Sequence, residues 1–195
     1  MSYSFFAYIA RMKYIGRWGL MRSTVQENVQ EHSHMVAILA HALAVIRRDK
    51  FNGTVDPGHV AAVALYHDAP EIFTGDLPTP VKYANPAIRD AYKAVEENAA
   101  HRLAAMLPQE MRPAFSSLLS ETDPEVLALV KAADKLSAYL KCQEELTAGN
   151  PEFRSAAQQT LEALQDCQLP ELDYFMETFL HSFQLTLDEL GGPTP

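Results

Sequence analysis

Four polar side chains in this sequence could together bind a metal ion: His32, His67, Asp68 and Asp134. His32 and His67 each lie in a run of apolar residues with helical spacing, and Asp134 follows two alanines in a third such run. A carboxylate near a buried face is costly unless it is paired or binds a cation, although Asp134 could also pair at the surface with a neighbouring lysine. Two imidazoles and two carboxylates suit Mn, Fe, Co, Ni or Zn better than Ca or Mg.

Helical geometry predicts that only one histidine in the run around residue 32 faces inward. His32 shares a helix face with Val29 and Val36, whereas His34 and His41 are turned to roughly the opposite side. A single inward histidine is more often a hydrogen-bonded core residue than a metal ligand. One divalent transition-metal ion is nevertheless our hypothesis, because it would account for all four polar side chains at once.

The elements that must position these residues are predicted to be helices. An Asn or Asp precedes proline at four places, and this pair favours a helix start because the side chain caps the first turn while proline loses no helical hydrogen bond there. No alternating strand pattern of useful length is found. Apolar spacing predicts helices over residues 4–14, 27–49, 57–69, 86–107, 124–148, 151–165 and 170–190.

The expected fold class is therefore all-α, with a single helical bundle over residues 1–195. Its core is expected at about residues 27–150, with the N-terminal helix 4–14 and the C-terminal helices 151–190 packed on it. Two segments, 16–24 and 74–84, do not fit a helical pattern. Loops on a rigid helical scaffold are favoured places for ligand contacts, so both segments are candidates for substrate binding.

Composition and charge exclude several classes of partner. The formal net charge of −9 argues against binding to a nucleic acid polymer, and a phosphate-bearing substrate would need a local positive group. No apolar run is long enough to span a membrane, and residues 1–14 lack the features of a secretory signal. With two cysteines that form no metal-binding spacing, we expect a cytoplasmic protein with reduced thiols and no membrane partner.

The order of the four residues resembles a known superfamily. A histidine, then a His-Asp pair, then an aspartate is the H…HD…D order of the HD-domain metal-dependent phosphohydrolases. The longer runs 67–71 (HDAPE) and 75–82 (GDLPTPVK), with Arg17-Trp18 before them, resemble the YfbR-type bacterial 5'-deoxynucleotidases. Similar residues continue through 139–142 and 173–177, so the resemblance covers almost the whole chain.

The resemblance implies a fold, a reaction and a partner. The fold is a single HD-domain helical bundle, and the protein is a cytoplasmic homodimer. The reaction is metal-dependent hydrolysis of deoxyribonucleoside 5'-monophosphates to deoxyribonucleoside and phosphate. The implied metal ligands are the four residues already identified: His32, His67, Asp68 and Asp134.

The resemblance also assigns roles to residues outside the ligand set. Arg17 orients the phosphate, and Glu71 assists proton transfer as water activated by the ion attacks phosphorus. Trp18 packs against the sugar and could leave no room for a 2'-hydroxyl. Asp76 either binds the sugar 3'-hydroxyl or protonates the leaving 5'-oxygen. The implied substrate-binding set is Arg17, Trp18, His32, Asp68, Asp76, Leu77, Pro78 and Thr79.

Three alternatives stay open at this point. Another HD-domain phosphohydrolase could act on cyclic nucleotides or nucleoside triphosphates, although a triphosphate needs more cationic contacts than Lys82 alone provides between Glu71 and Arg89. A non-catalytic regulatory module could bind the metal in a closed structural site. A purely structural helical protein would need other partners for all four polar residues.

Overall fold

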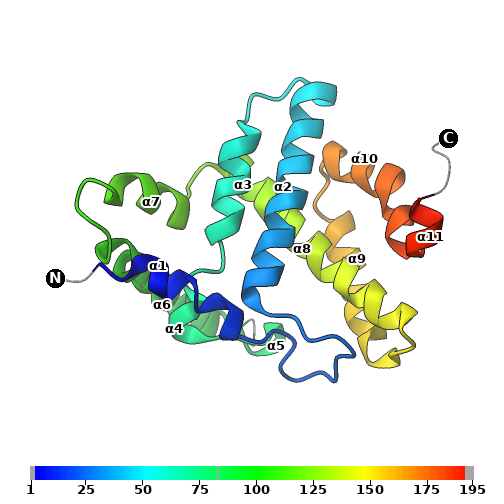
Figure 1. The fold of residues 1–195 in the computed structure, drawn as a ribbon, viewed down its shortest axis with the longest axis horizontal. Coiled ribbons are helices and arrows are strands. Elements are labelled where there is room, and N and C mark those ends of the chain that lie inside the picture. Colours follow the sequence, from blue (N-terminus) through cyan, green and yellow to red (C-terminus); the bar gives the residue numbers. More distant parts are fainter. Residues whose placement is uncertain (1–2, 83, 192–195) are drawn as a thin grey trace.

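The computed structural model describes residues 3–82 and 84–191, so both ends of the expected 1–195 domain lie outside the described residues. Helices form every regular element in this part of the chain, and the only strand-like contact there is an isolated antiparallel bridge between Gly16 and Asn28. Figure 1 shows the helices arranged around α2, the long helix near the centre of the view. The all-α prediction is therefore confirmed.

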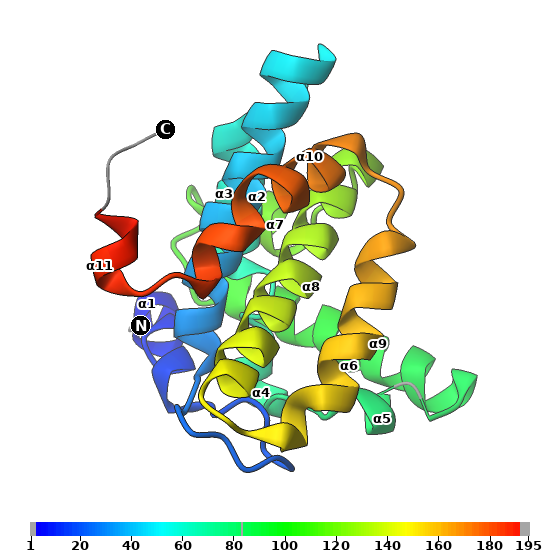
Figure 2. The ribbon, with the colours of Figure 1, turned by 90° about the vertical axis from the view of Figure 1, so that its right-hand side faces the viewer.

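Three helices form the centre of the molecule and carry the residues of interest. Helix α2 (Val29–Phe51) packs against α3 (Pro57–Tyr66) and α8 (Pro124–Thr147). Apolar side chains from all three helices, such as Val60, Leu43 and Leu136, are fully buried between them. Helices α9 (Arg154–Gln165) and α10 (Pro170–Phe179) cover α8 and α2 respectively, and Figure 2 shows both beside α8. Burial of this apolar surface is the main stabilising term.

The remaining elements are short or peripheral. Near the N-terminus are α1 (Phe5–Ile9) and the 3-10 helix η1 (Met12–Tyr14). Between α3 and α8 lie α4 (Glu71–Thr74), α5 (Thr79–Lys82), α6 (Pro86–Ala105) and α7 (Arg112–Leu119). A second apolar cluster joins α1 to α6 through Phe5 and Leu103, with Leu107 from the turn after α6. The others are η2 (Pro151–Phe153), η3 (Leu180–Gln184) and α11 (Leu187–Leu190).

The helix starts confirm the capping prediction. Each of the four Asx-Pro pairs begins a helix, and each Asx side chain accepts a hydrogen bond from a backbone N–H of the first turn: Asp56, Asn85, Asp123 and Asn150. Helix α2 begins with a capping box between Asn28 and Glu31. Because this box fixes the first turn of α2, it also fixes the direction of His32. No helix among the described residues is long and apolar enough to cross a membrane.

The structure corrects several predicted boundaries. The helix predicted over 57–69 ends at Tyr66, because the ring of Pro70 would clash with the Tyr66 carbonyl four residues earlier. His67 and Asp68 therefore lie in the turn after α3. The segment 74–84, expected to be non-helical, contains α5, and α7 was not predicted. The helices predicted over 4–14 and 170–190 are each divided by a turn or a 3-10 segment.

Candidate metal centre and active site

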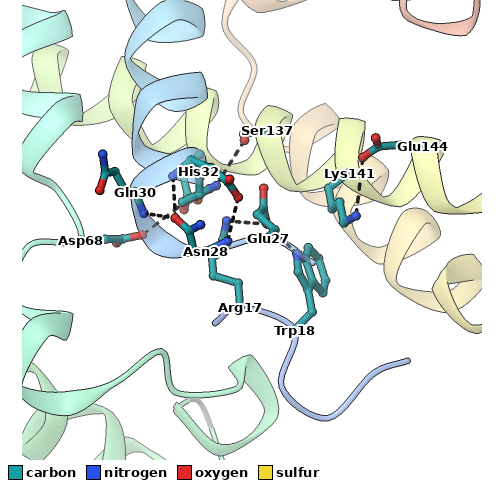
Figure 3. A network of polar contacts seen from close by, with 12 residues as sticks. Arg17, Trp18, Glu27, Asn28, Gln30, His32, Asp68, Ser137, Lys141 and Glu144 are labelled. Atoms are coloured by element: carbon teal, nitrogen blue, oxygen red, sulfur yellow. Dashed lines mark hydrogen bonds and ion pairs between the residues drawn. The ribbon is translucent and has the colours of Figure 1, made fainter. Parts of the chain in front are cut away.

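The four predicted ligands come from three parts of the fold and meet between α2, α3 and α8. His32 lies in the first turns of α2 and is completely buried. Its Nε2 atom lies 3.0 Å from Oδ1 of Asp134 on α8 and 3.5 Å from Oδ2 of Asp68. Nε2 of His67 lies 3.2 Å from the same Asp68 oxygen. Figure 3 shows His32 on α2 with Asp68 directed toward it. The structure therefore brings the predicted residues together.

The donor atoms of this cluster fit a metal ion. Ligand atoms of His32, His67 and Asp68 lie within 4.8 Å of one another. Asp134 is outside that group of three and joins the cluster through its contact with His32. Among the described residues, the Nε2 atoms of both imidazoles are buried and make no hydrogen bond. Their nearest polar neighbours are the carboxylate oxygens of Asp134 and Asp68, at 3.0 and 3.2 Å, and a cation shared between the imidazoles and the carboxylates would satisfy all of these atoms.

The other ring nitrogen of each histidine is held by a neighbour. Nδ1 of His67 lies 2.7 Å from the carbonyl oxygen of Ala64 and can donate to it. Nδ1 of His32 lies 3.2 Å from Oγ of Ser137, one turn beyond Asp134 on α8. A proton on Nδ1 leaves the lone pair of Nε2 free to ligate, and outer hydrogen bonds of this kind fix the ring orientation. Both imidazoles are therefore oriented for ligation through Nε2.

Replacing Ser137 with alanine is expected to weaken metal binding by roughly 10- to 100-fold, because the His32 ring loses the partner that orients it. A matched control is Ser33→Ala. Ser33 is also a buried serine beside His32, but within the described part of the chain its hydroxyl makes no hydrogen bond. Calorimetric titration with a single metal ion compares the metal affinities of the two variants. Equal affinities in both would contradict an orienting role for Ser137.

Charge within the cluster favours a bound cation. Burial alone would lower the pKa of His67, but the Asp68 carboxylate, together with Asp134 and the Ala64 carbonyl, outweighs burial and raises it to about 9. Burial likewise opposes ionisation of Asp68 and Asp134, yet the two histidines hold the pKa values of both carboxyl groups below their usual range. At neutral pH the metal-free cluster therefore holds a proton on His67 between ionised carboxylates. A divalent ion would replace that proton.

Two further carboxyl groups lie next to the cluster. Glu71 begins α4 and is buried, and one of its carboxylate oxygens has no hydrogen-bond partner among the described residues. Burial, together with the negative charges of Asp68 and Asp76, raises the pKa of Glu71 to about 9. Burial also raises the pKa of Asp76, while Arg17 opposes that shift. Crowding of acids in a partly buried site is typical of catalytic centres.

Arg17 is a cation that faces these acids: it lowers the pKa values of Asp68, Glu71 and Asp76, and Lys82 lowers those of Glu71 and Asp76 as well. Arg17 is bonded to the residues just before α2, since its backbone N–H donates to the carbonyl of Glu27 at 2.9 Å. One oxygen of the Glu27 carboxylate accepts from Arg17 Nη1 at 3.3 Å and from Trp18 Nε1 at 2.8 Å, as Figure 3 shows. Nothing in the sequence pattern singled out Glu27.

The rest of the predicted substrate loop lies between α4 and α5. Leu77 and Pro78 are half-buried, and Thr79 is exposed at the start of α5. Leu77 and Pro78 have apolar side chains, and no hydrogen bond within residues 3–82 and 84–191 joins Thr79 to Asp68, Glu71 or Asp76. Their predicted contact with substrate therefore stays a prediction. Ser137 was also missed, although its position three residues after Asp134 places it on the same helix face.

Comparison with known proteins identifies close relatives along nearly the whole chain. A family model described as "5'-deoxynucleotidase YfbR-like" matches residues 4–183. A 5'-deoxynucleotidase of Vibrio cholerae is 53% identical over 189 residues, which are 96% of this chain and 97% of the relative. One from Cronobacter sakazakii is 52% identical over 194 residues, covering 98% of this chain and 97% of the relative.

Solved structures share the fold. An HD-domain phosphohydrolase from Listeria innocua superposes with a TM-score of 0.80 at 24% identity, covering 92% of this chain and 88% of that one. An HD phosphohydrolase of cyanophage S-2L, bound to dA and one catalytic Zn²⁺ ion, superposes with a TM-score of 0.64 at 22% identity. That alignment covers 92% of this chain and 96% of the phage protein. At these identities the likeness concerns the fold.

Proposed function

Because the chain belongs to the YfbR-like 5'-deoxynucleotidase family, we propose that it hydrolyses deoxyribonucleoside 5'-monophosphates to deoxyribonucleosides and phosphate. The observation that carries the proposal is the meeting of His32, His67 and Asp68, with both Nε2 atoms buried and without hydrogen bonds among the described residues. A cationic side chain, Arg17, and an acidic one, Glu71, lie beside that cluster. This combination suits hydrolysis of a phosphate ester.

One divalent transition-metal ion (Co, Mn, Ni, Zn or Fe) is the proposed cofactor, with His32, His67, Asp68 and Asp134 as its ligands. The mixed nitrogen and oxygen donor set supports this class of ion, and the phage relative binds zinc. When bound, such an ion would polarise a phosphoryl oxygen and make water more acidic.

Charge balance gives Arg17 its role. Two neutral histidines and two ionised aspartates around a dication sum to zero, so the cluster has no surplus positive charge for a phosphate dianion. Arg17 would supply that charge, because its planar fork of donors fits phosphate oxygens. Only Nη1 of the guanidinium is engaged by Glu27, and its Nε is buried without a partner among the described residues. Donors therefore remain for the phosphate, and Arg17 orients the phosphorus for attack.

Proton transfer is assigned to the neighbouring acids. Glu71 would accept the proton from the attacking water once its carboxyl group is ionised. Asp76 would either bind the sugar 3'-hydroxyl or protonate the leaving 5'-oxygen. Burial raises the pKa of Asp76, which favours the protonated form that donation requires. Leu77, Pro78 and Thr79 complete the proposed substrate-binding set with Trp18, His32 and Asp68.

Phosphate release after chelation and reloading tests the proposal. The chelated protein should be inactive, and single transition ions should restore hydrolysis of deoxyribonucleoside 5'-monophosphates in preference to ribonucleotides. Cyclic nucleotides and nucleoside triphosphates assayed beside them separate other HD-domain activities. Metal binding without turnover of any nucleotide would instead indicate a regulatory module with a structural site.

Trp18 is the proposed determinant of sugar selectivity. Replacing it with leucine should narrow the ratio of kcat/KM for deoxy- over ribonucleotides, since a smaller side chain leaves room for the 2'-hydroxyl. Phe175→Leu, an aromatic truncation in the core at α10, controls for lost packing and should leave the ratio unchanged. An unaltered ratio in Trp18→Leu would count against the steric explanation.

Assembly and location complete the proposal. From the family resemblance we propose a cytoplasmic homodimer that binds small nucleotides, with no nucleic acid polymer and no membrane as partner. The net charge of −9 supports the exclusion of polymers. Sedimentation at several protein concentrations distinguishes a dimer from a monomer.

A further inference from the structure

One face of α8 carries a line of polar residues that begins at Asp134, one of the four candidate metal ligands, and continues beyond that site. Asp134, Ser137, Lys141 and Glu145 are three or four residues apart, so they follow one another along the same side of the helix. Lys141 is 6% exposed and Glu145 is completely buried. Buried ions are costly unless they are well paired. The burial of Lys141 and Glu145 therefore needs an explanation, and the metal site does not provide one.

The ion pair binds the backbone of the segment that precedes α2. Lys141 Nζ donates to Oε1 of Glu145 at 2.6 Å and to the carbonyl oxygen of Val25 at 2.7 Å. The Glu145 carboxylate also accepts from the backbone N–H of Thr24 at 2.8 Å, from its hydroxyl at 2.8 Å and from the N–H of Val25 at 3.2 Å. Asn150 adds a further bond to it at 2.9 Å. Two charged side chains on α8 therefore hold Thr24 and Val25.

The same segment presents Arg17 and Trp18 at its other end. Trp18 has a φ of 60°, a left-handed conformation that costs free energy in a residue other than glycine. The Trp18 carbonyl accepts from the N–H of Met21 at 2.8 Å. The side chains of Trp18 and Met21 pack with Cys142 and Phe153. A strained residue keeps its conformation only where its surroundings fix it, so the anchors at Thr24 and Val25, together with the bonds from Glu27, determine where Arg17 and Trp18 lie.

We propose that Lys141 and Glu145 are positioning residues: their ion pair holds the backbone of Thr24 and Val25 and thereby helps to place Arg17 and Trp18 for nucleotide binding. Figure 3 shows Lys141 on α8, on the side of the helix that faces Arg17 and Trp18. The part of this inference that concerns nucleotides rests on the proposed function, whereas the anchoring of the segment does not. Among the described residues, no hydrogen bond or ion pair joins Lys141 or Glu145 to His32, His67, Asp68 or Asp134.

Glu145→Gln tests the proposal, because glutamine keeps the size of the side chain and removes its charge. A matched control is Glu171→Gln. Glu171 is also buried, and it pairs with Arg47 at 2.9 Å between α10 and α2, away from the segment. Both variants lose the charge of a buried carboxylate, so both should be less stable to heat. Only Glu145→Gln should change the positions of Arg17 and Trp18.

The single tryptophan supplies a measurement that needs no substrate. In Glu145→Gln, Trp18 emission should shift to longer wavelength and quenching by acrylamide should increase, while Glu171→Gln keeps the wild-type spectrum. KM for a deoxyribonucleoside monophosphate should rise by about tenfold in Glu145→Gln, and kcat should fall as well, because Arg17 also orients the phosphate. Metal affinity should be unchanged in both variants.

Equal emission spectra and equal KM values in the two variants would overturn the proposal. If Glu145→Gln does not fold, Thr24→Val carries the test, since it removes only the hydroxyl bond to Glu145 and should give the same changes on a smaller scale. An unchanged spectrum and KM in a folded Thr24→Val would then overturn it. If wild-type protein hydrolyses no nucleotide, the proposed function fails, while the emission spectra still decide whether Glu145 anchors the segment.

Discussion

Replacing Asp68 with asparagine is expected to abolish phosphate release and to weaken metal binding by more than the roughly 100-fold that loss of an outer hydrogen bond can cause. Asp68 lies 3.2 Å from Nε2 of His67 and 3.5 Å from Nε2 of His32, so it is the carboxylate shared by both imidazoles. An amide keeps the shape of the side chain and removes the negative charge that a dication requires. Calorimetry with single metals measures the loss.

The pH dependence of metal affinity gives a second measure of the same change. In wild-type protein the ion must displace a proton from His67, whose pKa is about 9, so affinity should fall about tenfold for each pH unit below that value. In Asp68→Asn the carboxylate that raises the pKa of His67 is gone, so this decline should begin at lower pH. Asp90→Asn, an exposed control, should behave as wild type. Wild-type affinity and activity in Asp68→Asn would contradict the proposed site.

Replacing Glu71 with glutamine should lower kcat by about 10²- to 10⁴-fold while the protein keeps its metal ion, because the variant loses the group that takes up a proton but no proposed ligand. Without metal, burial and the neighbouring Asp68 and Asp76 raise the pKa of Glu71 to about 9, so its carboxyl group is protonated at neutral pH. A bound dication nearby would lower that pKa and produce the ionised carboxylate that can accept a proton. Metal binding would therefore favour the form of Glu71 that acts as a base.

Two measurements on the same preparation test this prediction. Metal content and affinity should stay close to wild type in Glu71→Gln, and phosphate release should be lost. Glu121→Gln is a control for a carboxylate outside the site: Glu121 pairs with His59 at 2.6 Å. A Glu71→Gln variant that releases the ion would make Glu71 a ligand, and one with unchanged kcat would exclude it from proton transfer.

Local interactions account for what could be predicted. The four Asx-Pro helix starts are correct because both the cap and proline act within one turn of the chain. The inward direction of His32 and the exposure of His34 and His41 follow from helix geometry, and the structure confirms them. Helix α7 was missed because a helix of eight residues that contains Pro113 is stabilised mainly by packing against its neighbours, which a local pattern does not reveal.

The sequence by itself determined the helical fold and the inward histidine of α2, since each depends on residue type and on spacing within one helix or turn. The order of His32, His67, Asp68 and Asp134 along the chain, through its resemblance to the HD-domain phosphohydrolases, indicated the set of candidate metal ligands. Tertiary structure alone decided which partners those side chains meet. Ser137 reaches His32 across 105 positions of sequence, and Lys141 reaches Val25 across 116. Such contacts depend on how α8 packs against α2 and the segment before it, and hydrophobic packing of this kind has no short-range signature in the chain.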